Sequence, residues 1–229
     1  MPCIPVSVIL PPPLDSAFGL VAERVIGGRF LDSVGRRSKG FFPGSPTQED
    51  FQDISVGPFT NTALYILYLK FHNSLSVRQL VVLTGAGLVK VPDLLTHNPP
   101  RSPKPSRAEV YEIKPLSPTG LVDGQAKLAA IRLLYSALSL PYRLGTVWSP
   151  NEKILLSKGD PLGVHLEVYF HYKRISPGLI VYDICIDGEL EKIALAVLLA
   201  ILAIILALIL KGVKIPIPMP DPVPVPVVA

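Results

Sequence analysis

The chain has 229 residues, which is enough for one domain of moderate size with its own core plus appendages, whereas two full domains would be cramped. A hydrophobic fraction of 49% is high for a soluble protein and indicates that one segment concentrates apolar residues. The formal charge of +4 permits contact with nucleic acid or anionic lipid but requires neither.

Residues 1–60 are rich in Pro, Gly and Ser with poor periodicity, so we expect a partly ordered N-terminal arm. Within it, "FGLVAERVIGGRFLDSVGRR" predicts a short helix ended by Gly27 and Gly28. The first residues lack a basic leader, so a secretory signal is not expected. Cys3 and Cys185 lie far apart and share no short spacing with histidines. They indicate neither a zinc site nor a disulfide framework, and a reducing compartment is the default expectation.

Residues 61–188 carry the pattern of a folded domain. A helix is expected over 61–83, followed by strands at 87–96 and 107–115 that form a hairpin with a long Pro-rich tip. After a turn segment at 115–124, helical spacing returns over 123–138 with Asp123 as a plausible N-cap. Further strands are expected at 142–148, 153–157, 163–172 and 178–186. In the third of these, His165, Glu167, Tyr169 and His171 share one face, which we interpret as solvated in preference to metal-binding.

The C-terminal part is unlike the rest. Residues 193–210 contain no polar side chain, and as a helix they would span roughly 27 Å, close to the thickness of a bilayer core. Within a hydrophobic helix over 189–211 we therefore predict a membrane span, contacting lipid through Ile193, Leu198, Leu202, Leu206 and Leu210. The alternative is a helix buried inside a larger assembly. Residues 212–229 form a Pro-rich tail, expected to be a stiff spacer or a ligand for another surface.

The predicted hairpin carries the candidate chemistry. Asp93 on one strand and Glu112 on the next can point to a common spot, and Lys114 lies on the same face as Glu112 because side chains alternate along a strand. Two acids and a lysine on one face suit a hard divalent cation such as Mg²⁺ or Mn²⁺ with oxygen ligands. Such a site supports phosphodiester hydrolysis. The alternative is a solvated strand face with a cross-strand ion pair.

These residues resemble the signature of the PD-(D/E)XK nuclease superfamily. Asp93 with Glu112, Ile113 and Lys114 is similar to its hairpin motif, and the phrase "VYEIKPLSPTGLVDGQAKL" resembles nuclease-fold domains of bacterial polymorphic toxins and contractile injection system cargo. The resemblance covers about residues 60–187. It implies a restriction-endonuclease-like α/β fold, a mixed sheet flanked by helices.

The resemblance also implies roles for individual residues. Asp93, Glu112 and the backbone carbonyl of Ile113 would hold the metal ion, and Lys114 would complete the catalytic set. Gln125 and Tyr135, on the following helix, resemble the glutamine and tyrosine of some branches, as catalytic and nucleic-acid-binding residues respectively. The loop residues Arg101, Lys104 and Arg107 would contact phosphates, although a solvated loop is an equal alternative.

The sequence departs from the family pattern at one point, which distinguishes an active nuclease from an inactive domain. Many members carry a further acid on the first helix, yet residues 61–83 contain none. Glu49, Asp50 or Asp53 would have to substitute, or else the domain has kept the fold and lost the activity.

The leading hypothesis is a metal-dependent nuclease-like effector or toxin that cuts DNA or RNA. It would be membrane-associated or exported as cargo, with a carrier particle or immunity protein as a partner. The alternative is an inactive nuclease-fold interaction protein of a membrane-associated or phage-tail-like assembly. In a third interpretation the apolar helix itself disrupts membranes.

Overall fold

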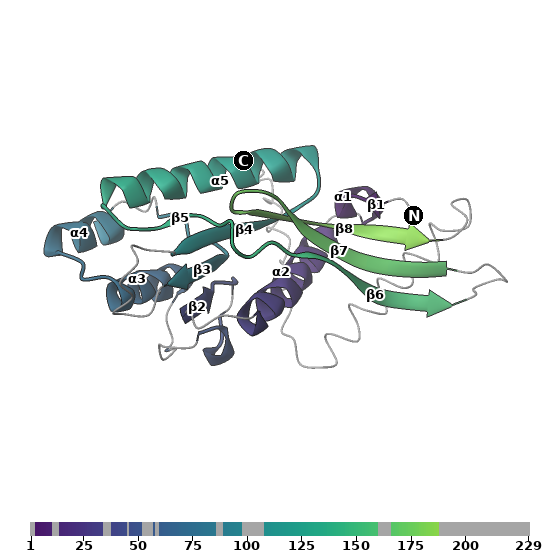
Figure 1. The fold of residues 1–229 in the computed structure, drawn as a ribbon, viewed down its shortest axis with the longest axis horizontal. Coiled ribbons are helices and arrows are strands. Elements are labelled where there is room, and N and C mark those ends of the chain that lie inside the picture. Colours follow the sequence, from purple (N-terminus) through teal and green to yellow (C-terminus); the bar gives the residue numbers. More distant parts are fainter. Residues whose placement is uncertain are drawn as a thin grey trace, which may run out of the picture.

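A curled mixed sheet with helices on both faces forms the centre of the structure, a computed structural model (Figure 1). The structure describes residues 3–10, 14–33, 38–44, 46–51, 57, 60–85, 89–97, 108–159 and 166–187. The mixed α/β class expected from the sequence is confirmed within these ranges.

The elements follow one another in this order: β1 (Cys3–Ile4), α1 (Val6–Ile9), α2 (Leu14–Asp32), β2 (Ser38–Phe41), the 3-10 helix η1 (Gln48–Asp50), α3 (Asn61–His72), α4 (Val77–Gly85), β3 (Leu94–His97), β4 (Glu109–Pro115), α5 (Pro118–Ala137), β5 (Arg143–Leu144), β6 (Asn151–Gly159), β7 (Leu166–Ser176) and β8 (Leu179–Asp187).

Strand β4 occupies the middle of the sheet, whose order is β2-β3-β4-β8-β7-β6. A hairpin is present as predicted, because β3 pairs antiparallel with β4 and places Leu94 opposite Tyr111. Its first strand is shorter than the predicted range 87–96 and covers Leu94–His97. On its other side β4 runs parallel to β8, while β6, β7 and β8 form an antiparallel meander. Short β5 adds to β4, and β1 adds to β8. The two neighbours of β4 therefore fix the direction and position of the strand that carries Glu112.

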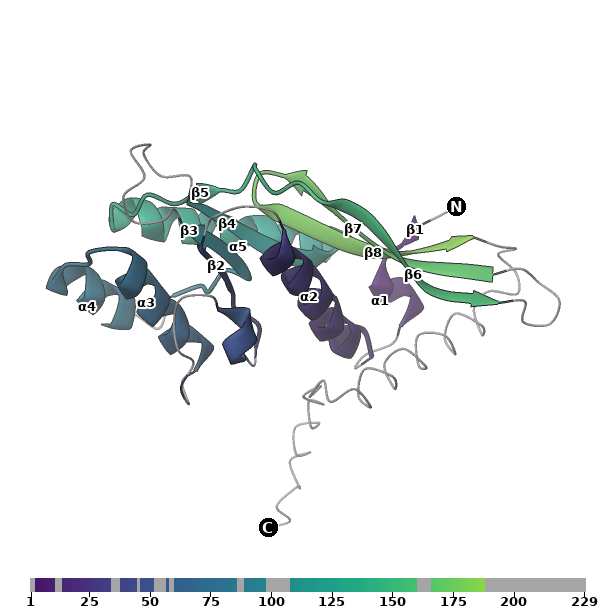
Figure 2. The same ribbon diagram turned by 60° about the horizontal axis from the view of Figure 1, so that its bottom comes forward.

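Helix α2 covers one face of the sheet, which Figure 2 brings forward. Its apolar side chains, including Phe18 and Phe30, pack against Tyr111 and Phe170. The helix runs through Gly27 and Gly28, so the prediction that these glycines end it is wrong. A side chain at residue 27 would meet the Phe41 ring at 2.5 Å, which explains a glycine inside this helix.

The opposite face is covered by α3 and α5. Leu64 and Tyr68 of α3 pack with Leu95, Val110 and the α5 side chains in a second core. The single helix expected over 61–83 is wrong, because it divides into α3 and α4. Ser76 and Gln79 account for the second start: the Gln79 N–H donates to Ser76 Oγ at 3.3 Å, and the Ser76 N–H donates to Gln79 Oε1 at 2.7 Å, a capping box.

Helix α5 begins earlier than expected. Ser117 is its N-cap and accepts a hydrogen bond from the Gly120 N–H at 3.1 Å, and Pro118 occupies the first helical position. Asp123 is therefore an exposed residue within the helix and the N-cap prediction for it is wrong. Gly120 and Gly124, in the stretch predicted to be a turn, are buried residues of this helix. A Cβ at Gly124 would meet Leu179 at 2.7 Å, so close packing requires a glycine there.

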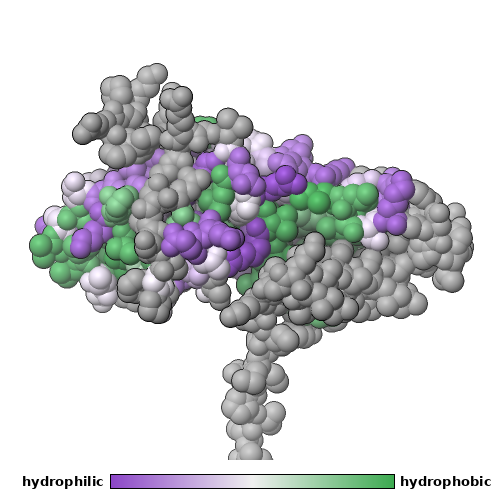
Figure 3. Space-filling view, turned by 90° about the horizontal axis from the view of Figure 1, so that it is seen from below, coloured by the Kyte–Doolittle hydropathy of each residue, from purple (hydrophilic) through white to green (hydrophobic). Residues whose placement is uncertain are grey.

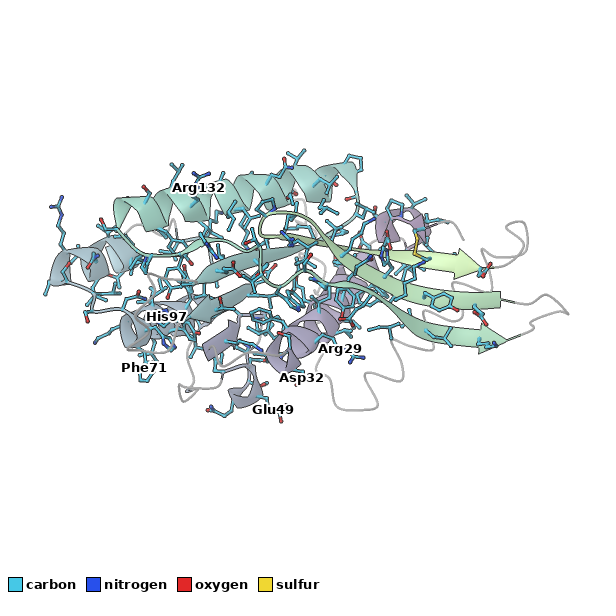
Figure 4. The ribbon with its side chains drawn as sticks, in the orientation of Figure 1. Arg29, Asp32, Glu49, Phe71, His97 and Arg132 are labelled. Atoms are coloured by element: carbon cyan, nitrogen blue, oxygen red, sulfur yellow. A yellow bond between two sulfur atoms is a disulfide. The ribbon has the colours of Figure 1, made fainter. Side chains whose placement is uncertain are left out.

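The two cysteines are bonded to each other, contrary to the expectation that they form no disulfide. Strand β1 places Cys3 directly opposite Cys185 of β8, and Figure 4 shows the resulting bond in yellow. The 182 residues between them conceal this proximity in the sequence.

The residues predicted to contact lipid lie in 188–229, outside the described residues. In the described part of the chain no helix is both long and apolar enough to span a bilayer. This part does carry apolar surface, as Figure 3 shows. An apolar pocket lies there between α2 and β6, lined by Phe18, Val21, Ala22, Val25, Ile154, Leu156 and Phe170.

Candidate functional site

A cluster of charged side chains lies along the C-terminal half of β4, next to the beginning of β3. Asp93 immediately precedes β3, and the antiparallel pairing places it next to the C-terminal half of β4. Glu112 and Lys114 lie in that half, which pairs with β8 on the other side. The structure thus brings together Asp93, Glu112 and Lys114, the three residues singled out in the hairpin.

The backbone fixes the two acids. Asp93 Oδ2 accepts a hydrogen bond from the Ile113 N–H at 2.6 Å, and the Phe42 N–H donates to the Asp93 carbonyl at 2.9 Å. The Glu112 N–H donates to Gly178 O at 2.8 Å. Gly178 has φ +77°, a conformation that favours glycine, so the β7–β8 turn that anchors Glu112 depends on this residue type.

Glu112 is fully buried and is contacted by two ammonium groups. Its Oε1 lies 2.7 Å from Lys114 Nζ and 2.7 Å from Lys127 Nζ. Its Oε2 is buried and has no hydrogen-bond partner among the described residues. A buried carboxylate oxygen without a donor costs free energy, and a cation offers a way to satisfy it.

Lys127 of α5 is a member of the cluster that the sequence did not indicate. It reaches both acids, with Nζ 3.2 Å from Asp93 Oδ1. Gln125, the residue predicted for this helix, is exposed and lines an outer pocket with Arg132, which Figure 4 labels on the outside of α5. Residues two apart in a helix are about 200° apart around its axis, so Gln125 and Lys127 cannot share a face.

Glu23 of α2 supplies a third acid from the opposite face of the sheet. Its carboxylate interacts electrostatically with Asp93, Lys114 and Lys127. Glu23 also lines a surface pocket of about 270 Å³ bordered by residues of α1, α2 and β8. Of the charged residues of the cluster, Glu23 is the one that lines this pocket.

Two acids of the cluster, Glu112 and Glu23, have pKa values raised toward or above neutrality. Burial, together with the charge of Asp93, raises the pKa of Glu112 to about 8, while the two lysines act in the opposite direction. Burial and Asp93 raise the pKa of Glu23 to about 7. Burial acts to lower the pKa of Lys114 and of Lys127, but the neighbouring carboxylates outweigh it and raise both. The lysines are therefore ammonium ions at neutral pH.

Glu109, on the same strand, shows what a structural buried acid looks like here. It is as buried as Glu112 but accepts hydrogen bonds from Tyr111 Oη at 2.8 Å and from the Thr146 N–H and hydroxyl, both at 3.2 Å. The Val147 N–H donates to it as well. Glu109 also pairs with Arg143 at 3.3 Å and anchors a loop through several donors, whereas the ion pairs of Glu112 within the described ranges are those with Lys114 and Lys127.

The other predicted residues lie elsewhere. Tyr135 is buried in the second core and its hydroxyl lies 2.5 Å from that of Tyr65, so it presents no surface to a nucleic acid. Asp50 pairs with Arg24 at 2.7 Å and Glu49 is exposed on η1, so neither joins the cluster. Other residues named in the sequence lie outside the described ranges: Asp53, Arg101, Lys104, Arg107 and His165.

A metal ion fits the acidic part of this cluster. Asp93 and Glu112 pair with two ammonium groups, and Glu23 interacts with them electrostatically, so the three acids and two lysines leave one negative charge when all are ionised. The N–H and C=O of one strand residue leave the strand on the same side, so the Ile113 carbonyl is on the side of Asp93. The donor set is therefore oxygen only, the type that Mg²⁺ and Mn²⁺ prefer.

Comparisons with known proteins identify no relative. No family model, no curated protein and no solved structure matches the chain.

Proposed function

We propose that the protein is a metal-dependent nuclease of the PD-(D/E)XK type that hydrolyses phosphodiester bonds. The observation that carries the proposal is the Glu112 carboxylate, buried beside Asp93 and two ammonium groups, with one oxygen left without a donor. A structural acid in the same strand, Glu109, instead accepts hydrogen bonds from the Tyr111 hydroxyl, the Thr146 N–H and the Arg143 guanidinium.

The arrangement of elements also supports this proposal. The β3–β4 hairpin is preceded by the helices α3 and α4 and followed by helix α5, and the later strand β8 runs parallel to β4, an order that resembles a restriction-endonuclease-like fold. Glu23 offers the first-helix acid whose absence from residues 61–83 favoured an inactive domain. The active hypothesis is therefore preferred over the inactive interaction protein.

Each residue has a definable task in this proposal. Glu23, Asp93, Glu112 and the Ile113 carbonyl would hold the ion, which when bound supplies Lewis-acid activation and a water of lowered pKa. Lys114 is an ammonium ion and therefore acts by stabilising negative charge that develops on the phosphate, not as a general base. Lys127 offers a second positive charge at the same place.

Metal affinity is expected to rise with pH. The acids must lose their protons to bind a cation, and the pKa of Glu112 is raised to about 8 and that of Glu23 to about 7. Calorimetric titration of the full chain in detergent should show Mn²⁺ binding that strengthens by about three orders of magnitude from pH 6 to pH 9, with proton release. Affinity that is constant over this range would contradict the assignment of these acids as ligands.

Cleavage of nucleic acid tests the function. The detergent-solubilised full chain should cut labelled DNA or RNA with Mg²⁺ or Mn²⁺ and stop when EDTA is added. Lys114→Ala should reduce the rate by about 100-fold or more, because it removes stabilisation of transition-state charge. Asp123→Asn, an exposed change on the outer side of α5, is the matched control and should cut like the wild type. Equal cutting by Lys114→Ala would overturn the proposal.

Membrane association is the second part of the proposed role and rests on the sequence of residues 193–210. We expect the full chain to float with anionic vesicles in a density gradient, because this run is long and apolar enough to cross a bilayer core. A chain truncated after residue 187 should remain at the bottom of the gradient. If both chains float equally, this segment is not the anchor.

A further inference from the structure

A second group of ligating side chains lies where β1 joins the sheet. It consists of Cys3 of β1, His171 of β7, and Asp183 and Cys185 of β8, and one ligand atom from each lies within 4.8 Å of every other. The strand register produces the group, because Cys3 pairs with Cys185 and His171 pairs with Asp183. Asp183 and Cys185 share a face since side chains alternate along β8.

The interior of this group is polar although it is buried. His171, Asp183 and Cys185 are all buried, whereas the sequence suggested a solvated face around His171. His171 Nδ1 lies 2.9 Å from Asp183 Oδ1, and Cys185 Sγ lies 3.5 Å from the same oxygen. On its other side the ring meets Asn151, with Nε2 3.1 Å from Asn151 Oδ1. The ring is thus held at both nitrogens, with Nδ1 directed to the acid.

The ligand set is the kind that binds zinc once the sulfurs are free. Two thiolates, one imidazole and one carboxylate complete the four-coordinate tetrahedral site that Zn²⁺ adopts, and thiolate ligands select it over Mg²⁺. With Zn–S near 2.3 Å and Zn–N near 2.0 Å, neighbouring ligand atoms are about 3.5 Å apart. The separations of the present group, which reach up to 4.8 Å, would shorten, while the two bonded sulfurs would move apart after reduction. In the zinc-bound form the Nε2–H tautomer of His171 would donate to Asn151 Oδ1, 3.1 Å away, and leave Nδ1 for the metal, which is the usual outer-shell arrangement.

In the structure the two sulfurs are bonded to each other and cannot act as thiolates. We propose that reduction of the Cys3–Cys185 disulfide converts this group into a zinc site. A dithiol reductant gives two electrons and two protons to the disulfide, forming two cysteine thiols and becoming a disulfide itself. Zn²⁺ then displaces the two thiol protons and takes His171 Nδ1 and Asp183 as its remaining ligands.

This site couples the redox state to metal binding while keeping β1 attached. The disulfide links β1 to β8 under oxidising conditions, and the zinc ion links the same two strands under reducing conditions. None of its residues belongs to the carboxylate cluster of Glu112, so the inference does not depend on the nuclease proposal.

Cobalt serves as the probe because its thiolate complexes absorb strongly. The detergent-solubilised full chain, reduced with a phosphine, should bind one equivalent of Co²⁺ with a thiolate-to-cobalt absorption band that Zn²⁺ then abolishes. The oxidised chain should show no such band. Cys3→Ser should lose at least half of the band intensity, and Asp183→Asn should weaken Zn²⁺ binding by about 10- to 100-fold. Asp123→Asn, an exposed change that belongs to neither site, is the matched control and should give the same band as the wild type.

Thiol alkylation provides a readout that does not depend on the variants folding. Zn²⁺ should slow alkylation of both cysteines in the reduced wild type by at least about 10-fold, since a metal-bound thiolate is a weaker nucleophile, and a chelator should restore the rate. A reduced chain without the thiolate–cobalt band, or alkylation unaffected by Zn²⁺, would overturn the inference.

Discussion

Glu112→Gln should abolish metal-dependent cleavage and at the same time stabilise the metal-free protein. The neutral amide cannot supply the buried negative charge that a divalent cation needs, so the cleavage rate should fall by about 1000-fold or more. Glu112 is fully buried beside Asp93, and burial is the first cause of its raised pKa of about 8. Removing this charge relieves the desolvation that the folded protein otherwise bears.

The size of the stability gain of the Glu112→Gln variant depends on pH. Between an unfolded pKa of 4.5 and a folded pKa of about 8, the folded chain holds more protons at Glu112 than the unfolded chain, so wild-type stability falls as pH rises through this window. The side-chain amide of the Glu112→Gln variant does not titrate. The advantage of the variant should therefore grow by about 2–4 kcal/mol from pH 4.5 to pH 8.5 and then level off. The two lysines titrate above this window and contribute nothing to it.

Denaturant unfolding of both full chains in EDTA at these pH values measures the difference. Asp123→Asn should follow the wild-type curve, because this exposed acid is not part of the cluster. If Glu112→Gln were less stable than the wild type at pH 8.5, the carboxylate would be a structural ion-pair partner of Lys114 and Lys127, and the site hypothesis would lose its support.

The hairpin part of the candidate site is local enough to be derived from sequence. The two-residue period of a strand places Glu112 and Lys114 on one face, and a hairpin returns the chain to a neighbouring strand. The structure has these residues in contact. A property that repeats every two residues within one strand needs no knowledge of the rest of the fold.

The other members depend on packing between elements that are distant in sequence. Glu23 lies in a region that the Pro and Gly content predicts to be a partly ordered arm, and Gly27 and Gly28 predict an early end of its helix. The signal for the longer helix α2 is the apolar spacing of Phe18, Ala22 and Ile26, which persists to Phe30. The disulfide partner of Cys3 is invisible in the sequence for the same reason, since only the sheet brings β1 to β8.

The sequence does not indicate Lys127, because the buried side of α5 is predicted from the apolar residues in its second half alone. Gly120 and Gly124 belong to the buried stripe with Leu128 and Ile131, yet glycines carry no hydrophobic signal. With the stripe complete, Lys127 lies four residues before Ile131 on the inner side of the helix, and Gln125 lies on the outer side. The apolar stripe of a helix is therefore incomplete when close packing requires glycine.

Lys127→Ala and Gln125→Ala should separate these two assignments by opposite effects on metal binding and catalysis. Lys127 Nζ lies against both Asp93 and Glu112, where it competes with a cation for the same oxygens. Its removal should tighten Mn²⁺ binding by about 10-fold, since two like charges about 4 Å apart repel each other by about 1–4 kcal/mol near a protein surface. The same change should slow cleavage by about 100-fold, because a positive charge near the scissile phosphate is lost. Gln125→Ala should alter neither quantity.

Calorimetric Mn²⁺ titration and single-turnover cleavage of the three full chains measure both effects, and a Gln125→Ala chain that loses activity while Lys127→Ala retains it would reverse the assignment of α5.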